Sequence, residues 1–199
     1  MTSIFPQIYD LAMRPFEATS FKKVRNELVR SATGKVLEVG SGTGINFPFY
    51  EQAQCVVAIE PNPKMNKLAV KRGRNSHVRI ILHEASAESL PFDDNTFDTV
   101  IATLVFCTIP NPLRALQEIQ RVSKPNARIL FFEHVQMEQK ILAKAQDFLS
   151  PFWARICDGC QLNRDTVSLI TYSGIEIITI HSLYAKLFLS IKCRNMKKG

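Results

Sequence analysis

The sequence contains the segment Val36-Leu37-Glu38-Val39-Gly40-Ser41-Gly42-Thr43-Gly44. A short apolar run that ends in glycines is typical of a buried strand of a parallel sheet leading into a tight turn. Glycines let the backbone turn sharply and let a ligand come close to it. In a doubly wound α/β sheet, a turn at this position binds a nucleotide-like ligand. By itself, however, such a turn can also be an ordinary loop.

The spacing of the glycines separates this turn from two common phosphate-binding turns. The dinucleotide pattern needs a glycine at position 45, where the sequence has Ile45, and a phosphate loop needs a Gly-Lys-Ser/Thr step that the sequence lacks. Glu60 follows a second apolar run, Val56 to Ile59, and its carboxylate can accept hydrogen bonds from both hydroxyls of a ribose. A lone Glu at a strand end can be a solvated terminus, but with the glycine turn it predicts a ribose-containing ligand without a pyrophosphate.

Further apolar runs alternate with segments that are typical of helices. Strands are expected at 78–82, 99–104 and 128–132, and helices at about 16–31 and 138–155. The best-marked helix begins at Asn111, a good N-cap residue, continues with Pro112 and is stopped by Pro125. Residues 175–180 and 185–193 are expected to form two strands joined by a turn near Ser182. The alternation predicts a doubly wound, mostly parallel α/β sheet with an antiparallel edge.

Length and composition favour a single domain over residues 1–199. The first residues lack the basic and apolar regions of a signal peptide, and no apolar run is long enough to cross a bilayer, so a cytoplasmic protein is expected. The five cysteines are an odd number, which favours free thiols. The net charge of +7 comes without an aromatic-rich basic motif, so nucleic acid is not an expected partner.

Further segments extend the pattern of the glycine turn. They are Ile59-Glu60-Pro61-Asn62, Ala87-Glu88-Ser89-Leu90-Pro91-Phe92 and Phe97-Asp98. With the turn they resemble the successive motifs of class I S-adenosylmethionine-dependent methyltransferases, in the branch of the ubiquinone and menaquinone methylases, over most of residues 9 to 135. The resemblance implies a Rossmann-like, three-layer αβα fold with a seven-stranded sheet of order 3-2-1-4-5-7-6, strand 7 being antiparallel. It also implies S-adenosylmethionine as cofactor and S-adenosylhomocysteine as product.

The resemblance assigns parts of the cofactor to individual residues. The turn from Gly40 to Gly44 matches residues that lie against the methionine moiety, Glu60 matches the one that holds the ribose, and Ser86 and Ala87 match those that face the adenine. Residues 1–31 are expected to form a helical lid, in which Tyr9 and Phe5 close over the cofactor or else fix the first helix to the body. The full set of expected cofactor contacts is Tyr9, Glu38, Gly40, Ser41, Gly42, Gly44, Glu60, Pro61, Ser86, Ala87 and Thr103.

Two departures from the family pattern stand out. Ser86 replaces the usual Asp that accepts from the adenine amino group, so this contact is expected to be weaker or to come from the backbone. Residues 124–127 read Lys-Pro-Asn-Ala where the family has Lys-Pro-Gly-Gly, which changes a turn but should matter little to the chemistry.

A closer group is suggested by Tyr9 to Met13, Thr103 to Cys107, Glu133 to Val135 and Asp158 to Thr166. These segments are similar to those of the methyltransferase-like thiol S-methyltransferases and their bacterial relatives. Animal members of that group carry a hydrophobic N-terminal membrane anchor. The chain shows no such segment, so membrane residence is not expected to carry over, although the basic C-terminal residues leave peripheral membrane contact open.

Candidates for substrate handling follow the strand that ends near Phe132. His134 and Asp158 are the expected catalytic residues, with a hydrogen-bonded structural histidine as the alternative for His134. Asp158 and Arg164 are expected either to orient their segment across the pocket or to pair with each other on the surface. Cys157 and Cys160 have the spacing of a zinc or redox pair, but no second pair accompanies them, so no metal site is expected. An apolar acceptor pocket, or else ordinary core, is expected from Phe106, Phe148, Phe152 and Trp153.

The expected function is methyl transfer from S-adenosylmethionine to a small, apolar or lipid-like acceptor, with a thiol preferred by resemblance. A phospholipid amine, a quinone precursor and a non-catalytic module that binds S-adenosylmethionine remain alternatives. A nucleic-acid methylase is disfavoured because Thr103-Leu104-Val105-Phe106 stands where an Asn/Asp-Pro-Pro-Tyr/Phe signature is expected. The sequence does not predict an oligomeric state.

Overall fold

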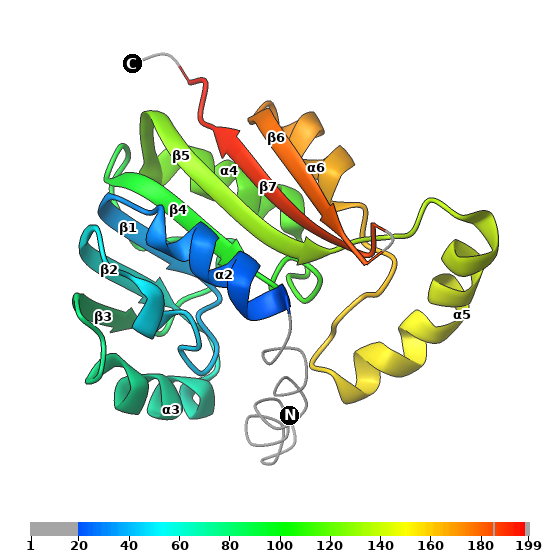
Figure 1. The fold of residues 1–199 in the computed structure, drawn as a ribbon, viewed down its shortest axis with the longest axis horizontal. Coiled ribbons are helices and arrows are strands. Elements are labelled where there is room, and N and C mark those ends of the chain that lie inside the picture. The colour runs from blue at the N-terminus through cyan, green and yellow to red at the C-terminus, as the bar shows by residue number, and fades with distance from the viewer. Residues whose placement is uncertain (1–19, 185, 198–199) are drawn as a thin grey trace.

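The computed structural model describes residues 20–184 and 186–197, and one sheet with helices on both faces dominates it (Figure 1). The strands are β1 (Gly34–Val39), β2 (Ala53–Ile59), β3 (Arg79–His83), β4 (Phe97–Thr103), β5 (Ser123–His134), β6 (Glu176–Leu183) and β7 (Phe188–Arg194). The helices are α2 (Ser20–Arg30), α3 (Pro63–Gly73), α4 (Pro112–Val122), α5 (Lys140–Ile156) and α6 (Thr166–Ser173), with the 3-10 helix η1 (Phe47–Phe49).

The strand order confirms the expected topology. The sheet runs β3-β2-β1-β4-β5-β7-β6, with β7 antiparallel to both of its neighbours and the remaining pairs parallel. Because β1, β2, β4 and β5 are parallel, the segments that follow them meet at one edge of the sheet, where α/β folds bind ligands. This carboxyl edge is where the glycine turn, Glu60, Thr103 and His134 are placed.

The apolar runs are continuous because each central strand is covered on both faces. Leu37 and Val39 of β1 point into the core shared with α4 and α6, whereas Val36, which precedes Leu37, points into the core shared with α2 and η1. Successive side chains of the strand therefore point alternately into the two cores, and none of the positions in the run faces solvent. Figure 1 shows α2 in front of the sheet and α4 and α6 behind it.

Local signals set the bounds of α4 as expected, with one difference. The Asn111 side chain accepts a hydrogen bond from the backbone N of Arg114 at 3.1 Å, and Pro112 occupies the first turn. The helix ends at Val122, however, and Pro125 already lies within β5. The helix therefore gives way to the strand before the proline is reached.

Three other expectations need adjustment. The turn near Ser182 was placed too early, because Ser182 pairs with Leu189 inside the ladder and the chain reverses between Leu183 and Phe188. Helix α6 was not expected at all. The expected helix at 16–31 is present as α2 over Ser20–Arg30, whereas Tyr9, Phe5 and the rest of the proposed lid lie outside the described residues.

Helix α5 buries polar side chains and exposes apolar ones. Gln146 and Ser150 are buried and hydrogen-bond the backbone of Val135 and Leu162. The helix stands beside the sheet in Figure 1 and covers neither of its faces. Its aromatic residues Phe148, Phe152 and Trp153 are 72%, 57% and 44% exposed, so the described structure does not gather them into an acceptor pocket. No helix among residues 20–184 and 186–197 is long and apolar enough to cross a membrane.

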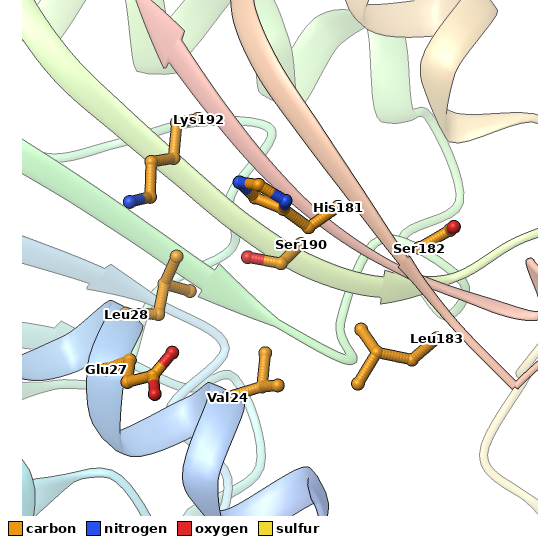
Figure 2. A pocket seen from close by; sticks show the side chains of 8 residues that line it. All are labelled: Val24, Glu27, Leu28, His181, Ser182, Leu183, Ser190 and Lys192. Carbon is orange, nitrogen blue, oxygen red and sulfur yellow. The ribbon is translucent and has the colours of Figure 1, made fainter.

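A cavity of about 240 Å³ lies between α2 and the β6–β7 hairpin (Figure 2). Val24 and Leu28 line it from α2, and His181, Ser190 and Lys192 line it from the two strands. Among the residues that the structure describes, none of those expected to bind cofactor or substrate lines this cavity. The described candidate residues lie instead toward the carboxyl edge of the sheet.

Candidate functional site

The glycine turn after β1 takes a conformation that favours glycine at three positions. Gly40, Gly42 and Gly44 have φ angles of +65°, +54° and +79°. A Cβ atom at Gly40 would come within 2.1 Å of Val105, and one at Gly44 within 2.5 Å of Phe47. At Gly42 a Cβ atom would meet nothing within 4 Å. Packing therefore excludes side chains at the outer two glycines, whereas Gly42 borders open space in which a ligand can approach the backbone.

Glu60 lies directly beside this open space. Its carboxylate accepts hydrogen bonds from the backbone N of Gly42 at 3.0 Å and of Asn62 at 2.9 Å. Burial raises the pKa of Glu60, these two hydrogen bonds lower it, and the charge of Asp158 raises it further. A carboxylate has about four acceptor positions, so two remain for ligand hydroxyls. Turn and acid thus fit a ribose at this position.

A buried polar network holds the turn from below. Glu38 accepts hydrogen bonds from Asn46 at 2.9 Å and from the Tyr50 hydroxyl at 2.7 Å. Asn46 also contacts Thr103 at the end of β4, and Arg25 of α2 donates to both Asn46 and Thr103. Glu38 and Thr103 therefore link β1 and β4 to the segment that follows the glycine turn. Their direct contact with the cofactor stays a prediction.

Burial raises the pKa of Glu38 from 4.5 to about 7, although the hydrogen bonds from Tyr50 and Asn46 oppose the rise. The stability that protonated Glu38 contributes is full below pH 4.5 and is lost as the pH rises to about 7, because the unfolded chain ionises first. We expect the free energy of unfolding to fall by about 3 kcal/mol over this range, at about 1.36 kcal/mol per pKa unit. The free energy of unfolding is measured by urea titration at pH 5 and at pH 7.5. In Glu38→Gln, the difference between the two pH values should be smaller than in the wild type by this amount. Equal falls in both proteins would contradict the assignment.

The remaining expected cofactor residues surround the turn at different depths. Ser41 is buried, and its Oγ has no hydrogen-bond partner among the described residues. This hydroxyl is therefore available for a hydrogen bond to a ligand. Ala87 is buried and Ser86 is exposed in the loop after β3, where Ser86 bonds Glu88. Pro61 is exposed after Glu60. These positions are adjacent to the edge, but their contacts with a cofactor remain predictions.

The segments after β4 and β5 bring a second group of side chains to the same edge. His134 Nε2 lies 3.3 Å from Cys160 Sγ, and Cys107 completes a cluster whose three ligand atoms lie within 4.8 Å of one another. Hydrogen bonding from Cys107 outweighs burial and, together with His134, lowers the pKa of Cys160 to about 5. Burial lowers the pKa of His134, but its hydrogen bond to Cys160 outweighs this and leaves the pKa raised. The pair has the character of a thiolate beside an imidazolium.

Two charged residues adjoin this cluster. Glu133 is fully buried, and one oxygen accepts from the backbone N of Val105 and Phe106 while the other has no partner among the described residues. Burial raises the pKa of Glu133 to about 7 despite these bonds. Arg164 donates to the backbone oxygens of Cys107 and Ile109, and its buried Nε lacks a partner in the described part of the chain.

The segment between α5 and α6 faces the glycine turn. Asp158 lies near enough to Glu60 for its charge to raise the pKa of Glu60, and the backbone N of Gln161 donates to Cys107 at 2.9 Å. Asp158 and Gly159 both have positive φ, which makes the tight turn at this place. Of the two expected arrangements of this segment, the structure favours the one that crosses the site over a surface pair of Asp158 with Arg164.

Sequence reasoning singled out His134 and Asp158 but missed their neighbours. Cys107 and Glu133 lie beside His134, together with Arg164, which the sequence had already indicated. Phe106, for which a pocket or ordinary core was expected, is core packed on Phe131. A signal existed for both cysteine and acid, because Glu133 directly follows a predicted strand and Cys107 lies three residues after the end of another. Proximity across strands was the missing information.

Known methyltransferases are similar to this chain. Residues 37–131 match a family model described as a methyltransferase domain. Thiol S-methyltransferase TMT1B of Rattus norvegicus is 36% identical over 152 residues, 73% of this chain and 62% of that protein, so the chain spans less than two thirds of this relative. Thiol S-methyltransferase TMT1A of Homo sapiens is 30% identical over 187 residues, 92% of this chain and 77% of that protein.

A solved structure agrees with the fold. The S-adenosylmethionine-dependent methyltransferase of Aquifex aeolicus superposes with a TM-score of 0.62, covering 87% of this chain and 88% of that one, at 19% identity. An identity this low shows the fold alone, whereas the relatives above show the family. The open glycine turn with Glu60 beside it fits the cofactor of that family, S-adenosylmethionine. The chain therefore belongs to the S-adenosylmethionine-dependent methyltransferases.

Proposed function

We propose that the chain transfers the methyl group of S-adenosylmethionine to a small, apolar thiol. The observation that carries the choice of acceptor is the half-buried Arg164 guanidinium beside the cysteine and histidine cluster. A positive charge at this wall favours an anionic acceptor over an ammonium group. The thiol S-methyltransferases among the relatives support the same choice.

Methyl transfer depends more on the alignment of the acceptor with the methyl group than on acid or base catalysis. Bound S-adenosylmethionine would supply a methyl group attached to a sulfonium sulfur. A nucleophile that attacks the methyl carbon in line would displace that sulfur. The open backbone at Gly42 and the Glu60 carboxylate position the cofactor, and Asp158 lies near enough to Glu60 to act on its charge. A thiolate is the reactive form of a thiol, so the acceptor side has to stabilise a negative charge.

Arg164 is the positive charge available for that task. His134 lies in hydrogen-bond contact with Cys160, whereas Arg164 has no carboxylate within ion-pair distance among the described residues. Its contacts to two backbone oxygens fix the guanidinium without neutralising it. The charge therefore lowers the pKa of a thiol bound nearby.

Arg164→Gln is expected to raise the pKa of the bound acceptor by about one unit, which corresponds to about 1.4 kcal/mol of lost electrostatic stabilisation. Glutamine keeps a polar amide donor at this position but carries no charge. The pH profile of kcat reports the pKa in the enzyme–substrate complex. Measured with phenylmethanethiol, which is mostly protonated at neutral pH, the midpoint should move upward in Arg164→Gln and stay in place in Arg164→Lys.

A uniform loss of kcat at every pH would mean that Arg164 only holds the two loops together, and would contradict its electrostatic role. The same assay with vesicles of phosphatidylethanolamine tests the alternative acceptor. An ammonium must lose a proton before attack, which requires a positioned base. Methylation of the lipid amine without turnover of any thiol would overturn the proposed acceptor.

A further inference from the structure

Three side chains with soft ligand atoms meet at the carboxyl edge although they are far apart in sequence. Cys107 comes from the loop between β4 and α4, His134 is the last residue of β5, and Cys160 lies between α5 and α6. Nε2 of His134 is 3.3 Å from Sγ of Cys160, and the three ligand atoms lie within 4.8 Å of one another. Cys107 and His134 are buried, and Cys160 is half-buried.

These separations match a tetrahedral zinc centre. Zinc binds thiolate sulfur at about 2.3 Å and imidazole nitrogen at about 2.0 to 2.1 Å, so ligand atoms around it lie roughly 3.5 to 3.8 Å apart. The observed 3.3 Å between Nε2 and Sγ is close to these values, and all three ligand atoms lie within 4.8 Å of one another. Thiolate with imidazole is a donor set that selects zinc over magnesium or calcium, which require oxygen ligands. Cys107, His134 and Cys160 supply three ligands, and catalytic zinc sites keep the fourth position open.

We propose that Cys107, His134 and Cys160 bind a zinc ion whose fourth position holds the sulfur of the methyl acceptor. The role of the acceptor rests on the proposed function, whereas the metal site stands on the geometry of the three side chains. Sequence spacing directs attention to Cys157 with Cys160, but Cys157 is not part of the cluster, and Cys107 and His134 take its place.

The position of the cluster directs the fourth ligand toward the cofactor. Cys107 lies two residues after Val105, whose side chain packs against Gly40 of the cofactor turn. Cys160 lies two residues after Asp158, which acts electrostatically on Glu60. Two of the three metal ligands thus lie in segments that reach the glycine turn or Glu60 beside it. An acceptor on the metal lies between the cluster and the open space at Gly42.

Charge balance explains the neighbouring Arg164. Two thiolates neutralise a zinc ion, and a third thiolate from the acceptor leaves one negative charge. The guanidinium of Arg164 interacts electrostatically with Cys107, Cys160 and Glu133, and its buried Nε has no partner among the described residues. Buried charges are tolerated when they are paired, so Arg164 and the acceptor complete a neutral site.

The transfer balances in atoms and charge. The acceptor thiol gives its proton to solvent as its sulfur binds the metal. Its lone pair then forms a bond to the methyl carbon, and the bond between that carbon and the sulfonium breaks, leaving the electron pair on the departing sulfur. A thiol and S-adenosylmethionine become a methyl thioether, S-adenosylhomocysteine and one proton. No oxidant or reductant takes part.

The metal content of the full chain tests the site directly. The protein is purified with a phosphine reductant that keeps the thiols reduced, and its zinc is measured by mass spectrometry. We expect about one zinc ion per chain in the wild type and in Cys157→Ser, and near none in Cys107→Ser and Cys160→Ser. Cys157→Ser is a matched control, because it removes a half-buried thiol from the same segment. Circular dichroism checks that each variant is folded. If Cys107→Ser does not fold, because its position is buried, Cys160→Ser still tests the site.

Cobalt substitution tests the open position without any turnover. Co²⁺ bound by two thiolates absorbs in the near ultraviolet, and phenylmethanethiol should add a third charge-transfer contribution that its methyl thioether does not add. Zinc-free wild-type protein, or full zinc in Cys160→Ser, would overturn the site even if thiols are methylated. Bound cobalt that does not respond to the thiol would overturn the acceptor role. A thiol response without methylation would support this inference while refuting the proposed function.

Discussion

Gly42→Val is expected to abolish binding of S-adenosylmethionine while the protein stays folded. The space beside Gly42 is open, and a branched side chain would fill it where the ligand approaches the backbone. The positive φ of +54° adds strain on the order of 1 to 2 kcal/mol for a residue with a side chain. Calorimetry should show at least about a hundredfold weaker binding, which corresponds to about 2.7 kcal/mol.

Gly174→Val is the matched control for this change. Gly174 ends α6 with a φ of +82°, and a Cβ atom there would also meet nothing within 4 Å. Both variants should therefore lose similar stability in thermal unfolding, but only Gly42→Val should lose the cofactor. Unchanged affinity in Gly42→Val, or an equal loss in Gly174→Val, would refute the placement of the cofactor at the glycine turn.

Glu60→Ala is expected to weaken S-adenosylmethionine and S-adenosylhomocysteine by similar factors. Both ligands have the same ribose, and charge-assisted hydrogen bonds to it are worth roughly 1.5 to 3 kcal/mol, or roughly 10- to 150-fold in affinity. The variant also loses the hydrogen bonds that Glu60 accepts from Gly42 and Asn62. Glu60→Gln, which retains one acceptor oxygen, should lie between the wild type and the alanine variant.

Glu51→Ala provides the comparison for the Glu60 series, because Glu51 is an exposed carboxylate paired with Arg30 on the surface. It should leave both affinities unchanged. A loss confined to S-adenosylmethionine in Glu60→Ala would place Glu60 near the methyl group rather than the ribose. The two ligands have to be measured side by side for this reason.

The fold was predictable because its signals are local. The run from Val36 to Val39, the cap at Asn111 and the Gly40 to Gly44 turn each depend on a few neighbouring residues. Helix α6 was missed although Asp165 caps its start and Gly174 its end, because eight residues carry little periodicity. Ser182 suggested a turn by composition, but pairing with β7 extends the strand through it.

The candidate site was predictable only where its residues lie close together in sequence. The glycine turn and Glu60 follow two adjacent strands, so topology alone brings them together. Cys107 and Cys160 lie on loops whose proximity depends on how the segment after α5 returns to the sheet, which no local pattern encodes. The aromatic residues of α5 are a case in which local spacing is misleading. Their spacing predicts an apolar stripe on the helix, but it does not predict that this stripe is exposed.

The most direct test of the central claim is to follow the methyl group itself. Purified protein is incubated with S-adenosylmethionine carrying a deuterated methyl group and with phenylmethanethiol, and the products are measured by mass spectrometry. We predict a deuterated methyl thioether and S-adenosylhomocysteine in equal amounts, and neither product with Gly42→Val. Binding of S-adenosylmethionine without any labelled thioether would contradict the claim that this chain is a thiol methyltransferase.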